Sequence, residues 1–164
     1  MKKYIIVIIS ALALAIQSHA ANTFAIFADE QTYLHCQSAL GQYRDVLISE
    51  GLDARIYHAD WQSPDEVKDI IRKLASQKRN PLEGAVFVGD VPIVMVRGGQ
   101  HLTTAFKMDE ERYPMQESSV ASDRFYDDFD LDFEFIARDT VDATRYFYKL
   151  TFFCNDTAPT EIYT

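Results

Sequence analysis

Carboxylates at alternate positions are the residues of this chain whose spacing most directly suggests chemistry. Four of them follow the order of the first half of a calcium loop, and carboxylate oxygens are the ligands that Ca²⁺ prefers. They are Asp128, Asp130, Asp132 and Glu134. The second half of the loop fits less well, because Phe133 stands where the sharp turn needs glycine and Asp139 replaces the usual glutamate. The spacing predicts a calcium or other divalent cation site.

The same alternation has two other interpretations. Apolar residues occupy the positions between the carboxylates, as on the buried face of a strand whose other face is wet. They are Phe129, Leu131, Phe133 and Phe135. The segment is strongly acidic, since 11 of the 25 carboxylates lie between residues 109 and 139, and it could also form an acidic patch that faces a substrate. The sequence leaves the three interpretations open.

The sequence shows no complete set of residues for nucleophilic catalysis. Cys36 follows His35 inside a predicted helix, where adjacent side chains point about 100° apart, so we expect Cys36 to be a packing residue. His58, near Asp60 at the end of a predicted strand, is expected to have a surface or capping role. His101 has no partner that the sequence identifies. Serine-hydrolase elbows, phosphate loops, dinucleotide fingerprints and zinc-type spacings are absent from the sequence.

The elements that position these groups alternate between strands and helices. Apolar runs at 23–28, 52–59 and 84–88 predict buried strands. Between them, Asp29 is placed to cap a helix that Gly51 ends, with apolar residues at helical spacing. Those residues are Leu40, Tyr43, Val46 and Leu47.

A second helix is predicted to follow Ser63. The serine is placed to accept from the helix backbone, Glu66 to reach back to the cap, and Pro64 suits the first helical position. The apolar residues that follow form one stripe, namely Val67, Ile70, Ile71 and Leu74. Strand, helix, strand, helix, strand is typical of an α/β fold with a parallel sheet and flanking helices.

The carboxyl ends of parallel strands meet at one edge of the sheet, where ligands of such folds gather. The sequence places Asp29, the stretch His58–Asp60 and Asp90 there. Beyond Asp90, Val91–Val96 is a candidate strand that Pro92 confines to an edge or a bend, and Arg97–Gln100 is a predicted turn.

Length and charge narrow the class of protein. A chain of 164 residues suits one globular domain. Its net charge of −9 disfavours nucleic acid as a partner, because phosphate backbones need clustered lysine and arginine. Residues 1–20 combine a basic start, the short apolar run Tyr4–Ile16 and a small-residue cleavage site. We therefore expect a signal peptide, export to the periplasm, cell surface or medium, and no stable membrane span after cleavage.

The other end has an unusual sequence. Phe152–Thr164 resembles a translated sequencing-adapter peptide, so residues 151–164 are expected to be an artefactual tail and 21–150 the domain proper. An ordinary C-terminal strand is the alternative. On the first interpretation the chain is the front part of a longer protein.

Three motifs in order resemble the gingipain-like cysteine peptidases. Val88–Pro92 matches the family's VGD-x-P turn, Ser122–Tyr126 resembles its SD-x-x-Y segment, and Phe135–Arg138 resembles its I-G-R strand, with Ala137 in place of the glycine. Val141–Leu150 resembles the helix that follows in that family.

The resemblance implies a caspase-like three-layer sandwich, here incomplete, and a secreted endopeptidase that cleaves protein or peptide substrates with a His–Cys dyad. The family's two catalytic residues lie beyond the matched part, so no catalytic residue is assigned in this chain. The alternative function is a non-catalytic secreted α/β module that binds carbohydrate, protein or Ca²⁺.

Overall fold

The computed structural model describes residues 21–100 and 107–151. The expected signal peptide 1–20, His101 and residues 152–164 of the expected tail lie outside these ranges. The strands are β1 (Thr23–Asp29), β2 (Asp53–Ala59), β3 (Leu82–Val88), β4 (Ile93–Arg97), β5 (Val120–Ala121), β6 (Asp132–Arg138) and β7 (Arg145–Thr151). The helices are α2 (Glu30–Ser49), α3 (Pro64–Ala75), α4 (Met115–Ser118) and α5 (Arg124–Asp127).

The first three strands form the predicted parallel sheet. Their order is β2-β1-β3, and β1 pairs with both neighbours in the same direction. Ile26 of β1 stands opposite Ile56 on one side and Val86 on the other. The prediction of an α/β fold with a parallel sheet is therefore confirmed for this part of the chain.

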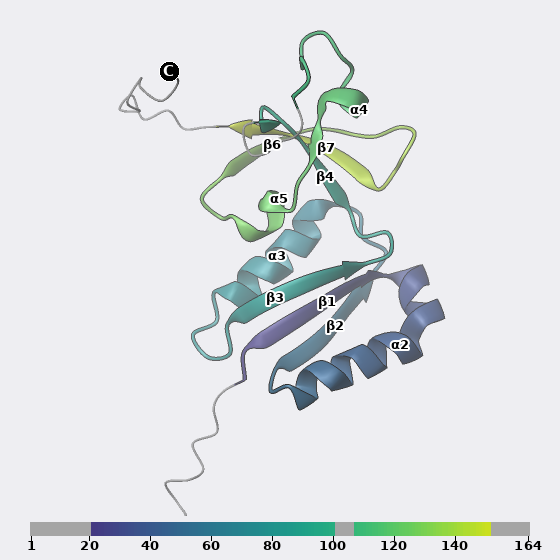
Figure 1. Ribbon diagram of the computed structural model, residues 1–164, viewed down its shortest axis with the longest axis vertical. Helices are drawn as coiled ribbons and strands as arrows, with labels where there is room; N and C mark the ends of the chain where they lie inside the picture. The colour runs from purple at the N-terminus through teal and green to yellow at the C-terminus, as the bar shows by residue number, and fades with distance from the viewer. Residues whose placement is uncertain (1–20, 101–106, 152–164) are drawn as a thin grey trace, which may run out of the picture.

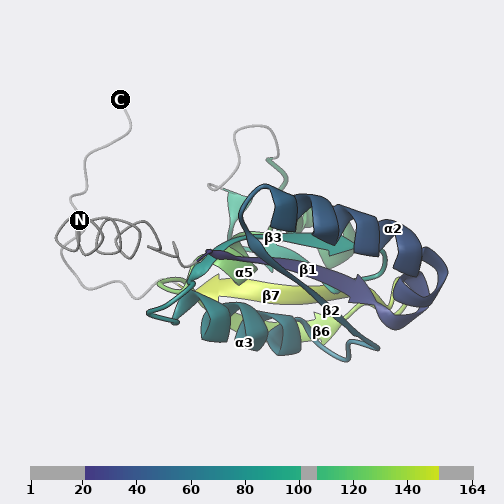
Figure 2. The ribbon, with the colours of Figure 1, turned by 90° about the horizontal axis from the view of Figure 1, so that it is seen from below.

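The two long helices cover opposite faces of that sheet (Figure 2). Successive side chains of a strand point to opposite faces, so Ala25 and Phe27 pack with Val67 of α3, whereas Ile26 and Ala28 pack with Leu40 of α2. These four β1 residues are fully buried. Between Thr23 and Asp29 the central strand therefore contains only apolar residues.

Both helices begin where the sequence indicates, but one cap differs. The Asp29 carboxylate accepts a hydrogen bond from the Thr32 amide at 2.8 Å and caps α2. At α3, Pro64 occupies the first turn as predicted, yet Ser63 makes no side-chain capping bond. Glu66 instead accepts from the Gln62 amide at 3.2 Å.

The apolar stripe predicted for α2 is only half correct. Leu40 and Leu47 pack against the parallel sheet. Tyr43 and Val46 are exposed, at 42% and 56% of their surface. A single layer of sheet beneath the helix can cover only one side of it, so the wider stripe has no partner.

A second sheet corrects the expectation of a single sheet with flanking helices. Its order is β5-β4-β7-β6, with β4 parallel to β7 and the other pairs antiparallel. β4 is an internal strand rather than an edge, and Pro92 lies in the turn before it. The two sheets lie at opposite ends of the molecule, with α3 and α5 between them (Figure 1).

The helix expected at Val141–Leu150 is wrong, because residues Arg145–Thr151 form strand β7. The strand is internal, with β4 on one edge and β6 on the other. Tyr146, Phe147 and Tyr148 are all buried. Aromatic residues favour strands, and the two neighbouring strands override the helix that the resemblance implied.

One hydrophobic core joins the two sheets. Val67 and Ile71 of α3 pack in the same cluster as Val94 of β4 and Tyr148 of β7. Phe125 of α5 is also fully buried there. Because α3 contacts both sheets, the described part of the chain forms one packed unit.

Candidate functional site

Asp29 links the start of α2 to the turn after β3. Its Oδ1 accepts from the Thr32 amide at 2.8 Å and its Oδ2 accepts from the Asp90 amide, also at 2.8 Å. Asp90 lies 61 residues further along the chain. The predicted gathering of Asp29 and Asp90 at the carboxyl edge of the parallel sheet is therefore present in the structure.

Gly89 is required at this junction for two reasons. Its φ of +79° lies in the region that side chains rarely adopt. A Cβ atom there would also lie 2.2 Å from the Asp29 Oδ2 and 2.2 Å from the Thr32 hydroxyl oxygen. The glycine of the Val88–Pro92 motif thus serves the close approach of the two turns.

The protonation of Asp29 follows from these contacts. Burial by itself would raise its pKa, but hydrogen bonds from the Thr32 side chain and from the amides of Thr32 and Asp90 lower it below the ordinary value of 3.8. The carboxylate is therefore ionised at neutral pH, with both oxygens engaged. Such a group positions backbone and is poorly suited to proton transfer.

A second motif meets the same turn. The hydroxyl of Tyr126, from the Ser122–Tyr126 segment, donates to the Pro92 carbonyl at 2.6 Å. Burial raises the pKa of Tyr126, which keeps the phenol protonated as a donor. Its ring contacts Phe87 of β3, with centroids 4.9 Å apart. The Ser122–Tyr126 segment therefore packs against β3 and the turn that follows it.

A hollow of about 460 Å³ opens beside Asp29, at the carboxyl edge of the parallel sheet. Trp61 and Tyr146 form aromatic walls, each fixed to the backbone: the indole donates to the Ala28 carbonyl and the phenol to the Gln62 carbonyl, both at 2.8 Å. Arg138 lies over the Tyr146 ring at 5.0 Å from its centroid. Both sheets thus contribute to the hollow.

The chemistry of the hollow is that of binding. Four carboxylates and one guanidinium line it, and no cysteine, serine or histidine is among its described lining residues. The carboxylates are Asp29, Glu30, Asp60 and Asp90. Carboxylates beside aromatic rings can hold a polar or cationic ligand.

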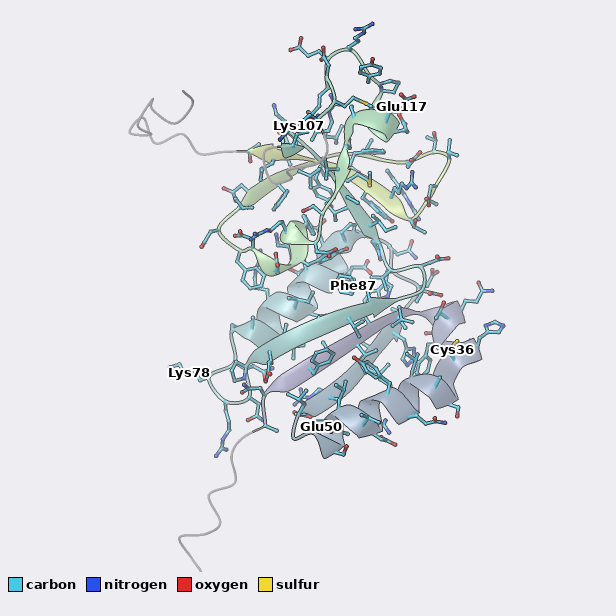
Figure 3. All side chains as sticks on the ribbon, in the orientation of Figure 1. Cys36, Glu50, Lys78, Phe87, Lys107 and Glu117 are labelled. Carbon is cyan, nitrogen blue, oxygen red and sulfur yellow. The ribbon has the colours of Figure 1, made fainter. Side chains whose placement is uncertain are left out.

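The histidines and Cys36 lie apart from any dyad in the described ranges. His58 Nδ1 is 2.7 Å from the Glu30 carboxylate, and its ring stacks on Tyr33 with centroids 3.6 Å apart. His35 bonds to the Gln31 carbonyl at 2.7 Å. Cys36 is exposed on α2 (Figure 3), so the expectation that it is a packing residue is wrong. No hydrogen bond joins it to a histidine within the described residues.

The four carboxylates of the predicted calcium loop lie along a turn and a strand. Asp128 directly follows α5; its carboxylate accepts from the Asp130 amide at 3.0 Å and lies 3.7 Å from the Arg124 guanidinium. Asp132 and Glu134 are exposed on β6, where Glu134 stands in register with Lys149. Across residues 21–100 and 107–151, no group of three or more His, Cys, Asp or Glu side chains is placed to hold a metal ion.

The apolar side of this segment fits the wet-strand interpretation in part. Phe133 packs on Phe125, with centroids 5.3 Å apart, and Leu131 contacts the core. Phe129 and Phe135 are exposed, at 41% and 54%. The pairing of β6 with β7 is irregular between Phe135 and Ala137, and such a bulge breaks the alternation of faces.

Sequence reasoning missed several residues of the hollow, among them Trp61, Arg138 and Tyr146. Trp61 follows a predicted strand directly, so its position at the carboxyl edge could have identified it. Tyr146 could not be identified because its segment resembles a helix. Arg138 could not be identified because it reaches the hollow only through the second sheet.

Within the described residues, no helix combines the length and apolarity needed to cross a bilayer.

Comparison with known proteins identifies no relative of this chain. No family model, no curated protein and no solved structure matches this chain.

Proposed function

We propose that residues 21–150 form the N-terminal part of an exported cysteine endopeptidase domain of the gingipain-like, caspase-fold type. On this proposal the His–Cys dyad lies downstream, and the chain supplies the framework on which it acts. In such a dyad the thiolate attacks the peptide carbonyl while the imidazole transfers protons. The substrate is protein or peptide.

The observation that carries the proposal is the contact between the two family-like motifs. Tyr126 donates to the Pro92 carbonyl, and Asp29 accepts from the Asp90 amide on the other side of the same turn. Residues that resemble a peptidase therefore concentrate at the carboxyl edge of a parallel sheet, which is where α/β enzymes bind their ligands. The hollow beside them is lined by carboxylates, Arg138 and two aromatic rings.

The alternative is a non-catalytic secreted module. The same hollow favours this alternative, because its aromatic walls and carboxylates could bind a ligand without residues from elsewhere in a longer protein. The two functions differ in whether a reactive cysteine exists.

Recovery of the uninterrupted gene tests the proposal. We expect its reading frame to encode a histidine and a cysteine after further buried strands, and its product to cleave peptides until the thiol is alkylated. As a matched control, Cys36→Ser in that product should cleave normally and remain sensitive to alkylation, because Cys36 is exposed and has no histidine partner in the described ranges. Cleavage abolished by Cys36→Ser, or a gene without a downstream cysteine, would refute the proposal.

A further inference from the structure

The hollow at the carboxyl edge of the parallel sheet carries charges of both signs, and they come from different sheets. Asp29, Asp60 and Asp90 stand at or just after the ends of the three parallel strands. Arg138 ends β6 of the second sheet. A volume of about 460 Å³ is within the range of small-molecule sites in proteins. The two sheets therefore bring opposite charges to one cavity of that size.

Two of the four lining carboxylates are already engaged by the protein. Both oxygens of Asp29 accept backbone amides, and a Glu30 oxygen lies 2.7 Å from the Nδ1 of His58. The carboxylates of Asp60 and Asp90 are exposed, and they make no hydrogen bond or ion pair with any described residue. Asp60 and Asp90 are therefore the lining carboxylates that are available to a ligand.

The guanidinium of Arg138 is held in place but has no carboxylate partner. Its Nε donates to the Ala143 carbonyl at 2.7 Å, and it lies over the Tyr146 ring. It makes no ion pair within residues 21–100 and 107–151. The neighbouring cation, Arg145, pairs with Asp142 at 3.1 Å. The terminal nitrogens of Arg138 are thus available to an anionic group, in the planar fork that suits a carboxylate.

The aromatic walls of the hollow are fixed. The half-buried indole of Trp61 donates to the Ala28 carbonyl, and the buried phenol of Tyr146 donates to the Gln62 carbonyl. Burial raises the pKa of Tyr146, which keeps this phenol protonated as a donor. The Trp61 ring also contacts Phe27 of the core, with centroids 6.1 Å apart. Rings that are already ordered can contact an apolar group at little further cost in entropy.

The free charges indicate which class of ligand suits the hollow. A ligand with only a positive charge would leave Arg138 unpaired beside it. A ligand with only a negative charge would be repelled by Asp60 and Asp90. A ligand with both charges close together can pair with each group. The hollow is therefore complementary to a small zwitterion with an apolar part.

We propose that this hollow binds a free α-amino acid with an aromatic side chain. Its ammonium group pairs with Asp60 and Asp90, its carboxylate pairs with Arg138, and its ring contacts Trp61 and Tyr146. This binding site goes beyond the proposed peptidase function and does not depend on it.

Isothermal titration calorimetry of the 164-residue chain tests the proposal with four ligands. We expect L-phenylalanine to bind, and glycine to bind at least about tenfold more weakly because it has no ring. N-acetylphenylalanine lacks the ammonium and phenylalaninamide lacks the carboxylate, so each should bind at least about threefold more weakly than phenylalanine. No binding of phenylalanine, or equal binding of the acetylated ligand, would overturn the proposal. An amide that binds as tightly as phenylalanine would indicate a site for cations alone and would also overturn it.

Protein variants locate the two charged contacts. Arg138→Gln should weaken phenylalanine binding about threefold to tenfold but change phenylalaninamide binding less than about twofold, because the amide has no carboxylate for Arg138 to hold. Combining Asp60→Asn with Asp90→Asn should weaken both of these ligands but not N-acetylphenylalanine. Arg44→Gln, which removes an exposed guanidinium on α2, is the matched control and should change none of them more than about twofold.

Equal weakening of phenylalanine and its amide by Arg138→Gln would refute the carboxylate contact and with it the proposal. If Arg138→Gln does not fold, the four ligands decide on the unchanged chain. None of these measurements involves peptide cleavage. A gene without a downstream cysteine would therefore refute the peptidase and leave this site standing, whereas a failure to bind phenylalanine would refute the site alone.

Discussion

Asp29 and the acidic run Asp128–Glu134 contain the same functional group in opposite surroundings. Asp29 is half-buried, and each of its carboxylate oxygens accepts a backbone amide. In the acidic run, Asp130, Asp132 and Glu134 are exposed to solvent. The Asp29 carboxylate links two turns that are far apart in the sequence, whereas the exposed carboxylates face solvent from β6 and the turn before it.

The difference shows that the backbone around a carboxylate determines its role. A turn with φ of +79° at Gly89 allows the Asp90 amide to approach Asp29. An extended strand instead points its carboxylates away from the backbone at intervals of two residues. A conspicuous run of charges is therefore a weaker guide to a site than one aspartate between two turns.

Among the predicted variants, substitution of Gly89, in the turn that contacts Asp29, should lower stability the most. Gly89→Ala is expected to lower the free energy of unfolding by about 2–4 kcal/mol, because strained backbone and a collision with Asp29 add together. Gly51→Ala is the matched control, since Gly51 also has positive φ but open space around it. It should cost about 1–2 kcal/mol in chemical denaturation. Equal effects would show that Asp29 does not crowd the turn.

Asp29→Asn should have an intermediate effect. An amide nitrogen cannot accept, so one of the two backbone amides loses its partner, at a cost of about 1–3 kcal/mol. The pKa of Asp29 is lowered in the folded state. Its contribution is therefore present above the ordinary pKa and lost as the pH falls through the folded value. Denaturation measured between about pH 6 and pH 2 should show a smaller acid destabilisation in Asp29→Asn, and identical profiles would contradict this assignment.

Substitutions in the acidic run Asp128–Glu134 should change stability the least. Changing Asp130 and Asp132 together to asparagine should alter stability by no more than about 0.5 kcal/mol, because both are exposed. Calorimetry with millimolar Ca²⁺ is expected to show no heat, and the melting temperature should not move. Heat that disappears in the double variant would instead support the calcium site that the spacing predicts.

Part of the candidate site was predictable because it depends on strand ends. Asp29 and Asp90 each follow an apolar run, and parallel strands bring their carboxyl ends to one edge. The hollow was not predictable in the same way. Arg138 and Tyr146 belong to strands of the other sheet, and no local pattern indicates that this sheet packs through α3 against the first.

Local pattern alone determined the three parallel strands, the starts of both long helices and the composition of the central strand, because hydrophobic periodicity and caps act over a few residues. Tertiary structure alone decided that Val141–Leu150 contains a strand rather than a helix, and that residues 91–151 build a second sheet. These outcomes depend on pairing between segments far apart in the chain. Aromatic residues such as Tyr146 and Tyr148 are compatible with either state until pairing with β4 and β6 fixes the segment as a strand.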